Sequence, residues 1–242
     1  MSTDMSGKSA LRRELLAARR LLSEEDVRDA SAVLAGRALD LPELAAAGTV
    51  AAYVSVGREP GTRALLDALR ERGVRVLLPV LLPDNDLDWA AYDGAERLVR
   101  AGRGLLEPDG PRLGVGAVLD ARVVLLPGLA VDGRGMRLGR GGGSYDRVLA
   151  RLERAATDAG ADGDAGAGAD AGAGAGAGAD AGAGADAGAG ADAGAGADAA
   201  AGPALAVLLY DHEVVERVPE EPHDRPVHVV VTPGGTRRFT GK

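Results

Sequence analysis

Short, almost continuous apolar runs separated by helical segments constrain the fold of this chain more than any other feature. Residues 49–56 (TVAAYVSV), 122–129 (RVVLLPGL) and 204–210 (ALAVLLY) are the clearest of these runs, and residues 74–82, 87–92 and 227–232 are further strand candidates. Runs without polar alternation are typical of strands that are covered on both faces. Strands that alternate with helices predict an α/β fold: a single three-layer domain with a mostly parallel, doubly wound, Rossmann-like sheet.

The segments between these runs carry helical patterns. Residues 8–22 place Leu11, Leu15, Leu16 and Leu22 on one stripe, as in an amphipathic helix. Ser23 and Asp26 form a capping-box signal for a second helix that extends to about residue 39. Further helices are expected over residues 62–72 and 145–154. In an open sheet of this kind, ligands bind beyond the carboxyl ends of the strands.

A low-complexity stretch interrupts the pattern at residues 156–202. It consists of alternating Ala and Gly with Asp at intervals, and its eight aspartates account for the whole formal net charge of −8. Glycine raises the entropy cost of ordering the chain and the aspartates repel one another, so we expect a disordered insertion. Residues 1–155 and 203–242 should then form one domain. A spacer or partner-binding segment is the functional alternative.

Composition excludes several classes of protein. The chain has no cysteine, which excludes disulfide scaffolds, zinc–thiolate sites and thiol nucleophiles. No apolar run approaches the ~20 residues that a membrane helix needs, and Lys8, Arg12 and Arg13 precede any run of signal-peptide length. The balanced charge outside the insertion gives no case for binding nucleic acid. We therefore expect a soluble, cytoplasmic protein.

The segment richest in chemistry is residues 127–147 (PGLAVDGRGMRLGRGGGSYDR), between an expected strand and an expected helix. Its glycines leave backbone amides bare, and Arg137, Arg140 and Arg147 add positive charge. Amides at a helix N-terminus together with guanidinium groups favour an anion, typically a polyphosphate. Asp146 could hold the accompanying Mg²⁺. The alternative is a flexible turn, and the segment is neither a P-loop nor a G-x-G-x-x-G fingerprint.

Other candidates are weaker on pattern alone. Lys8 and Arg12 share a helix face, which equally suits a solvated basic surface. Glu59 follows the run 49–56 directly, where such a sheet places ligand contacts, but it could be an ordinary loop carboxylate. Asp224, ahead of the last strand, could be a second metal ligand or a plain loop residue. The three histidines are scattered, and no metal pair or catalytic triad is indicated.

Taken together, these segments resemble the 5-formyltetrahydrofolate cyclo-ligase family, whose members are also called 5,10-methenyltetrahydrofolate synthetases. The resemblance rests on KSALR at residues 8–12, EPGT at 59–62, GMRLGRGGGSYDR at 135–147, YDHE at 210–213, and Val218-Pro with His223-Asp224. It covers the chain apart from the Ala-Gly-Asp stretch. Family members commonly have two tyrosines before the aspartate of the loop, and Ser144 stands in the first of these positions.

The resemblance implies an ATP- and Mg²⁺-dependent conversion of 5-formyltetrahydrofolate to 5,10-methenyltetrahydrofolate, ADP and phosphate. Arg140 and Tyr145 would be catalytic, and Asp146 and Asp224 would hold Mg²⁺. Contacts to ATP are implied for Lys8, Arg12, Arg137, Leu138, Gly139, Arg140, Gly141, Gly142, Gly143, Ser144 and Tyr145. Contacts to the folate are implied for Val54, Glu59, Arg140, Gly141, Gly142, Gly143 and Ser144. We expect a monomer whose partners are these two small molecules.

Two other functions stay open from the sequence. An enzyme on a similar sheet, such as a sugar-phosphate isomerase or an acyl-CoA transferase, would keep a phosphate loop and work without ATP, with Glu59 as its carboxylate. A non-catalytic folate- or nucleotide-binding protein is the third possibility. Turnover separates this last class from the first two.

Overall fold

A seven-stranded sheet forms the centre of the protein. The computed structural model describes residues 3–164, 202–222 and 224–239. The strand order is β11-β10-β9-β6-β1-β2-β3, in which the five inner strands are mutually parallel and both edge strands are antiparallel to their neighbours. The strands are β1 (Thr49–Ala51), β2 (Arg75–Leu81), β3 (Leu87–Ala91), β6 (Val123–Leu126), β9 (Ala204–Leu208), β10 (Val229–Thr232) and β11 (Gly235–Arg238). The mostly parallel sheet predicted from the apolar runs is confirmed.

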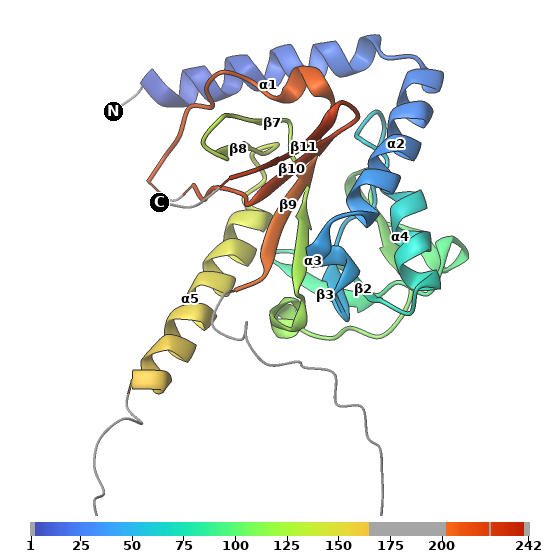
Figure 1. The fold of residues 1–242 in the computed structure, drawn as a ribbon, viewed down its shortest axis with the longest axis vertical. Helices are drawn as coiled ribbons and strands as arrows, with labels where there is room; N and C mark the ends of the chain where they lie inside the picture. The colour runs from blue at the N-terminus through green and yellow to red at the C-terminus, as the bar shows by residue number, and fades with distance from the viewer. Residues whose placement is uncertain (1–2, 165–201, 223, 240–242) are drawn as a thin grey trace, which may run out of the picture.

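Helices cover both faces of this sheet (Figure 1). The helices α2 (Glu24–Leu39), α3 (Pro42–Ala45) and α4 (Arg63–Glu71) pack on one face. The helix α5 (Ser144–Asp164) and the short 3-10 helix η3 (Val115–Asp120) pack on the other. Ser23 caps α2 through the expected reciprocal hydrogen bonds with Asp26. The three-layer arrangement is therefore the predicted one.

A hydrophobic core lies on each face of the sheet, and successive residues of a strand belong to the two cores in turn. Val123 and Leu125 of β6 lie in the core beneath α2 and α4, whereas Val124 and Leu126 lie in the core beneath α5. Because successive side chains of a strand point to opposite faces, a strand that is buried on both sides must be apolar throughout. All four residues of β6 are buried, which explains why its sequence shows no polar alternation.

The direction of chain winding changes between β1 and β6. From β1 the chain crosses through α4 to β2 on one side, whereas β6, β9 and β10 follow on the other side of β1. At such a switch the segments leaving the two adjacent strands diverge and open a crevice at their carboxyl ends. The fold therefore predicts the ligand site beside the residues that follow β1 and β6.

The predicted strand over residues 49–56 is shorter in the structure and ends at Ala51. After Ala52, whose amide bonds the Leu77 carbonyl, the backbone pairs with the side chain of Thr62. The Thr62 hydroxyl donates to the Tyr53 carbonyl and accepts from the Ser55 amide. Thr62 stands at the N-cap position of α4, but its hydroxyl is occupied by this loop and makes no cap bond.

The helix expected to end at residue 154 is longer in the structure. The helix α5 continues to Asp164, so residues 156–164 of the predicted insertion are helical. Alanine is the strongest helix former, and the alanines that begin the repeat extend α5 even though glycines follow. The rest of the predicted insertion, residues 165–201, lies outside the described residues.

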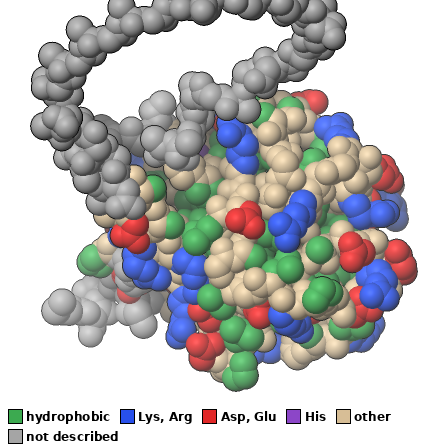
Figure 2. All heavy atoms as spheres, turned by 90° about the horizontal axis from the view of Figure 1, so that it is seen from below, with side chains coloured by type: hydrophobic (Ala, Val, Ile, Leu, Met, Phe, Trp, Pro, Cys, Tyr) green, Lys and Arg blue, Asp and Glu red, His purple; other side chains and the backbone are tan. Residues whose placement is uncertain are grey.

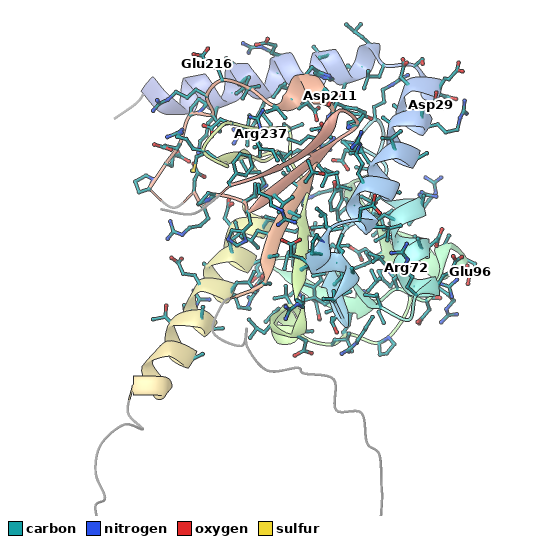
Figure 3. The ribbon with its side chains drawn as sticks, in the orientation of Figure 1. Asp29, Arg72, Glu96, Asp211, Glu216 and Arg237 are labelled. Carbon is teal, nitrogen blue, oxygen red and sulfur yellow. The ribbon has the colours of Figure 1, made fainter. Side chains whose placement is uncertain are left out.

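The first helix, α1 (Thr3–Leu21), packs outside the main layers on a small hairpin (Figure 1). Leu15 contacts a cluster formed by the strands β7 (Ala130–Val131) and β8 (Arg137–Leu138) and by Val218. A second hairpin joins β4 (Leu98–Arg100) to β5 (Leu106–Pro108). The remaining 3-10 helices are η1 (Ala95–Arg97), η2 (Gly102–Gly104) and η4 (Asp211–Glu213). Asp211, labelled in Figure 3, accepts a hydrogen bond from the Gly234 amide and so ties η4 to the β10–β11 turn.

Charge is mixed on the visible surface. On the described part of the face in Figure 2, lysine and arginine side chains alternate with aspartate and glutamate, and no extended area of one sign is seen. This mixture agrees with the balanced charge that remains when the aspartate-rich stretch is set aside.

Candidate active site

A cavity of about 670 Å³ lies at the carboxyl ends of β1, β6 and β2. Tyr53, Val54 and Glu59 enter it from the segment after β1, and Pro127 and Gly128 enter from the segment after β6. The glycine-rich loop that leads from β8 into α5 forms a further wall. The cavity therefore occupies the switch point that the strand order indicates.

The glycine-rich loop, residues 139–143, comes close to α1. Gly141 and Gly143 have φ values of +89° and +78°, in the left-handed region that favours glycine. A Cβ on Gly141 would lie 3.3 Å from the Arg12 guanidinium carbon, and Arg12 Nε donates to the Gly139 carbonyl at 2.9 Å. Arg12 therefore fixes the loop where α5 begins, and bare amides at a helix N-terminus favour an anion.

Two buried polar groups beneath this loop lack partners. Among the described residues, neither Arg137 Nε nor the Tyr145 hydroxyl has a hydrogen-bond partner, and both residues line the cavity. Burial lowers the pKa of Arg137, although the nearby charge of Asp146 acts in the opposite direction. Burial raises the pKa of Tyr145. Such groups are costly unless a partner arrives, so they indicate where an oxygen-rich ligand would bind.

Glu59 is buried and holds Arg140 over the cavity. One Glu59 oxygen accepts the Val56 amide at 2.9 Å, and the other lies 3.2 Å from Arg140 Nε. The Arg140 side chain is 51% exposed, whereas that of Glu59 is 8% exposed. The carboxylate is therefore rigidly placed, and the guanidinium is free to turn toward a ligand.

Lys8 joins the helix α1 to the loop between η4 and β10. Its Nζ lies 2.6 Å from Asp224 Oδ2 and 2.8 Å from Glu221 Oε2. Burial alone would lower the Lys8 pKa, but hydrogen bonds and charge from Asp224 and Glu221 outweigh it and leave the pKa raised. Lys8 thus stays positively charged at the rim of the cavity.

The carboxylates in the cavity suit a magnesium ion that arrives with a polyphosphate. The Asp146 side chain is half exposed and lies 3.8 Å from Arg137, and Asp224 lies on the same cavity. Within the described ranges, no three acidic or histidine side chains gather into a cage. Mg²⁺ commonly takes one or two carboxylates and completes its shell with water and phosphate oxygens, so this donor set fits it.

The structure brings all the sequence-predicted site residues to this one cavity. They are Lys8, Arg12, Val54, Glu59, Arg137, Leu138, Gly139, Arg140, Gly141, Gly142, Gly143, Ser144, Tyr145, Asp146 and Asp224. Arg147, the third arginine of the loop, does not line the cavity and instead lies 3.4 Å from Asp84.

Sequence reasoning missed one side of the cavity. The β4–β5 hairpin contributes Arg103, Leu105, Leu106 and Glu107, and the loop before β10 contributes Glu221. In the sequence, Glu221 lies in an acidic segment close to Asp224, and this position could have identified it as a site residue. The sequence of the hairpin shows only an arginine between two glycines. This local pattern is also typical of an ordinary turn.

Comparison with known proteins identifies the family. The sequence model of the 5-formyltetrahydrofolate cyclo-ligase family matches residues 4–161. This chain belongs to that family. It is 47% identical to the 5-formyltetrahydrofolate cyclo-ligase of Mycolicibacterium smegmatis over 148 residues, which cover 59% of this chain and 74% of the relative. It is 35% identical to the Escherichia coli K12 cyclo-ligase over 144 residues, covering 57% of this chain and 78% of that one.

Solved structures share the cyclo-ligase fold. The NMR structure of 5,10-methenyltetrahydrofolate synthetase from Aquifex aeolicus superposes with a TM-score of 0.67 at 24% identity, covering 97% of this chain and 94% of that one. The synthetase from Mycoplasma pneumoniae gives a TM-score of 0.59 at 15% identity, covering 93% and 98%. At these identities the likeness shows the fold alone. The family resemblance noted from the motifs is confirmed by the sequence comparisons.

None of the described helices of this cyclo-ligase family member combines the length and the apolar character that crossing a bilayer requires.

Proposed function

We propose that this protein is an ATP- and Mg²⁺-dependent ligase that cyclises 5-formyltetrahydrofolate to 5,10-methenyltetrahydrofolate, releasing ADP and phosphate. Membership of the cyclo-ligase family supports the reaction class. The observation that carries the proposal is the pair of unsatisfied buried donors, Arg137 Nε and the Tyr145 hydroxyl, beneath a glycine-rich loop at a helix N-terminus. The proposed enzyme acts as a monomer on these two small molecules.

The chemistry requires activation of a poor leaving group. The formyl oxygen attacks the γ-phosphorus of ATP, and the bond from that phosphorus to ADP breaks. The folate N10 nitrogen then attacks the formyl carbon and loses its proton, and the bond from carbon to the phosphorylated oxygen breaks to release phosphate. These steps need positioning and charge neutralisation more than a protein nucleophile.

The cavity supplies groups for each part of this reaction. Lys8, Arg12 and the amides of residues 139–143 would bind the phosphates, and Arg140 with Tyr145 would contact the transferring phosphoryl group. Glu59, with Val54 beside it, would accept paired N–H bonds from the pterin ring. Because Arg140 now lies on Glu59, we propose that the pterin displaces it toward the phosphates. Bound Mg²⁺ would neutralise phosphate charge, held by Asp146 and Asp224.

An absorbance assay tests the proposal directly. Purified protein is mixed with 5-formyltetrahydrofolate, and methenyltetrahydrofolate formation is followed with ATP and Mg²⁺ together, with each alone, and with neither. We expect a rise only when both are present. A rise without ATP would contradict activation by phosphorylation. No rise from protein shown to be folded would favour a binding protein or another substrate.

Substitution of Tyr145 by phenylalanine should separate catalysis from folding. The Tyr145 hydroxyl makes no hydrogen bond among the described residues, so its removal costs the free protein no bond and should leave Tm unchanged or raised. If the hydroxyl donates to a phosphoryl oxygen during reaction, kcat should fall about 10-fold or more. Steady-state kinetics and a thermal melt without ligand provide the two measurements.

Tyr92→Phe is the matched control. The Tyr92 hydroxyl donates to Asp67 at 2.6 Å, and Tyr92 does not line the cavity. This variant should lose stability and keep its kcat. If both variants keep kcat, the proposed contact between Tyr145 and phosphate is wrong.

A further inference from the structure

The β4–β5 hairpin builds a side of the cavity that the reaction described above does not use. Glu107 of β5 accepts a hydrogen bond from the Leu81 amide at 3.0 Å, which ties the hairpin to the last residue of β2. The turn of the hairpin, η2, then brings Arg103 to the cavity. The hairpin is therefore an extension of the site beyond β2, on the side away from β6.

The wall between β2 and this turn is apolar and only half buried. Its members are Val56, Pro79, Leu81, Leu105 and Leu106, each partly accessible and each lining the cavity. Apolar surface that faces a cavity favours an apolar or aromatic group of a ligand. This wall therefore suits the flat middle of an elongated substrate whose polar ends lie elsewhere.

Arg103 adopts a backbone conformation that arginine seldom takes. Its φ is +60°, and Asn85, with φ +65°, is the only other non-glycine residue at positive φ in the described part of the chain. The two side chains are joined, because Arg103 Nη1 donates to Asn85 Oδ1 at 3.2 Å. Glycine would avoid the strain at this turn, so an arginine held there indicates a use for its side chain.

The charge of Arg103 is uncompensated in the free protein. Arg140 pairs with Glu59 and Lys8 pairs with Asp224, whereas Arg103 makes no ion pair within residues 3–164, 202–222 and 224–239. Two other arginines lie near it but are paired, Arg147 with Asp84 and Arg151 with Asp86, on either side of Asn85. Arg137, which bonds the Pro127 carbonyl, lies at the end of β6, and β1 separates β6 from β2, so two strand spacings of about 5 Å each intervene.

We propose that Arg103 binds the carboxylates of the substrate's glutamate tail, while the apolar wall contacts the aminobenzoyl ring. The proposal rests on the proposed function, which makes a folate the substrate. A folate is elongated, with a pterin at one end, an aromatic ring in the middle and an anionic glutamate at the other end. The cavity offers Glu59, the apolar wall and Arg103 in the corresponding order across β1 and β2.

Arg103→Gly is the most informative variant, because glycine accepts the positive φ of this turn while the side chain with its guanidinium is removed. KM is measured with 5-formyltetrahydrofolate and with the matching 5-formyltetrahydropteroate, which lacks glutamate. We expect KM for the folate to rise about fivefold, the upper range for an exposed charge pair, and KM for the pteroate to stay unchanged. The KM for ATP, kcat and Tm should change little, and high salt should reduce the difference.

Arg100→Ala is the control, since Arg100 lies on the same hairpin outside the cavity. It should change neither KM. Equal increases with both substrates in Arg103→Gly would mean that the residue supports the hairpin and does not bind the tail. An unchanged folate KM would also overturn the proposal. The same comparison can be made without turnover by measuring the Kd of each ligand by calorimetry. A wild-type protein that binds the folate but does not convert it would refute the proposed function and leave the tail-binding proposal testable.

Discussion

Replacing Arg140 with alanine is expected to lower kcat about 10²–10³-fold and to leave the stability of the protein almost unchanged. The reason lies in how little the side chain does in the free protein. It is half exposed, and its one ion pair, with Glu59, is at 3.2 Å. A guanidinium that meets the transferring phosphoryl group only during reaction lowers the activation barrier without contributing to folding. Single-turnover kinetics with saturating ATP measure the effect on the chemical step.

Arg147→Ala provides a matched control for this variant. Arg147 stands in the first turn of α5, close to Arg140 in sequence, and pairs with Asp84 outside the cavity. Its kcat should stay within about twofold of wild type, because Arg147 does not line the cavity. Loss of its exposed pair should lower the free energy of unfolding by at most ~1 kcal/mol. If Arg140→Ala behaves like Arg147→Ala, Arg140 does not stabilise the transferring phosphate. If Arg140→Ala raises the KM for the folate and leaves kcat unchanged, Arg140 acts only through its ion pair with Glu59.

Replacing Glu213 with alanine is expected to lower the free energy of unfolding by about 3–5 kcal/mol. Glu213 is completely buried and accepts Arg19 Nε at 2.6 Å and Arg19 Nη2 at 3.0 Å. Burial alone would lower the Arg19 pKa, but the hydrogen bonds and charge of Glu213 outweigh it and leave the pKa raised. Alanine would leave this buried guanidinium without its counter-charge, and denaturant titration followed by circular dichroism measures the loss.

The exposed pair between Arg225 and Glu153 supplies the comparison. Their closest atoms are 3.0 Å apart, and the side chains are 40% and 55% exposed. Glu153→Ala should cost less than about 1 kcal/mol. A Glu213→Ala variant as stable as Glu153→Ala would show that water or a rearranged side chain replaces the lost carboxylate. Since Arg19 also bonds the Gly128 carbonyl beside the cavity, Glu213→Ala should additionally raise the KM for ATP.

The sheet was predictable because burial on both faces leaves a simple mark on the sequence. Strands such as β6 are apolar at every position, and the predicted runs fall on them. The edge strand β11 (GTRR) was not predicted, because it is largely exposed and its pairing with β10 depends on backbone hydrogen bonds. The end of β1 was misplaced for a related reason. The hydroxyl of Thr62, which lies in the following loop, takes the backbone bonds that would have continued the strand.

The residues of the site also differ in how well the sequence predicts them. The glycine loop was recognisable because its residues are adjacent in the sequence and share one chemistry. Lys8, Glu59 and Asp224 each had an ordinary alternative, and only the fold brings them to one cavity. Arg103 carried no local signal, since its significance arises from its place across β2 and from the backbone conformation of its turn.

The contact between Lys8 and Asp224 joins residues 216 positions apart, and this has a consequence for biosynthesis. A nascent chain that extends only to residue 220 already contains the sheet strands β1 and β6, the glycine loop and Glu59, but not the two carboxylates that hold Lys8. Contacts so distant in sequence form late, because closing the intervening loop costs entropy first. The cavity therefore becomes complete only after residues 221–224 have left the ribosome, and a prematurely terminated chain should be unable to bind nucleotide.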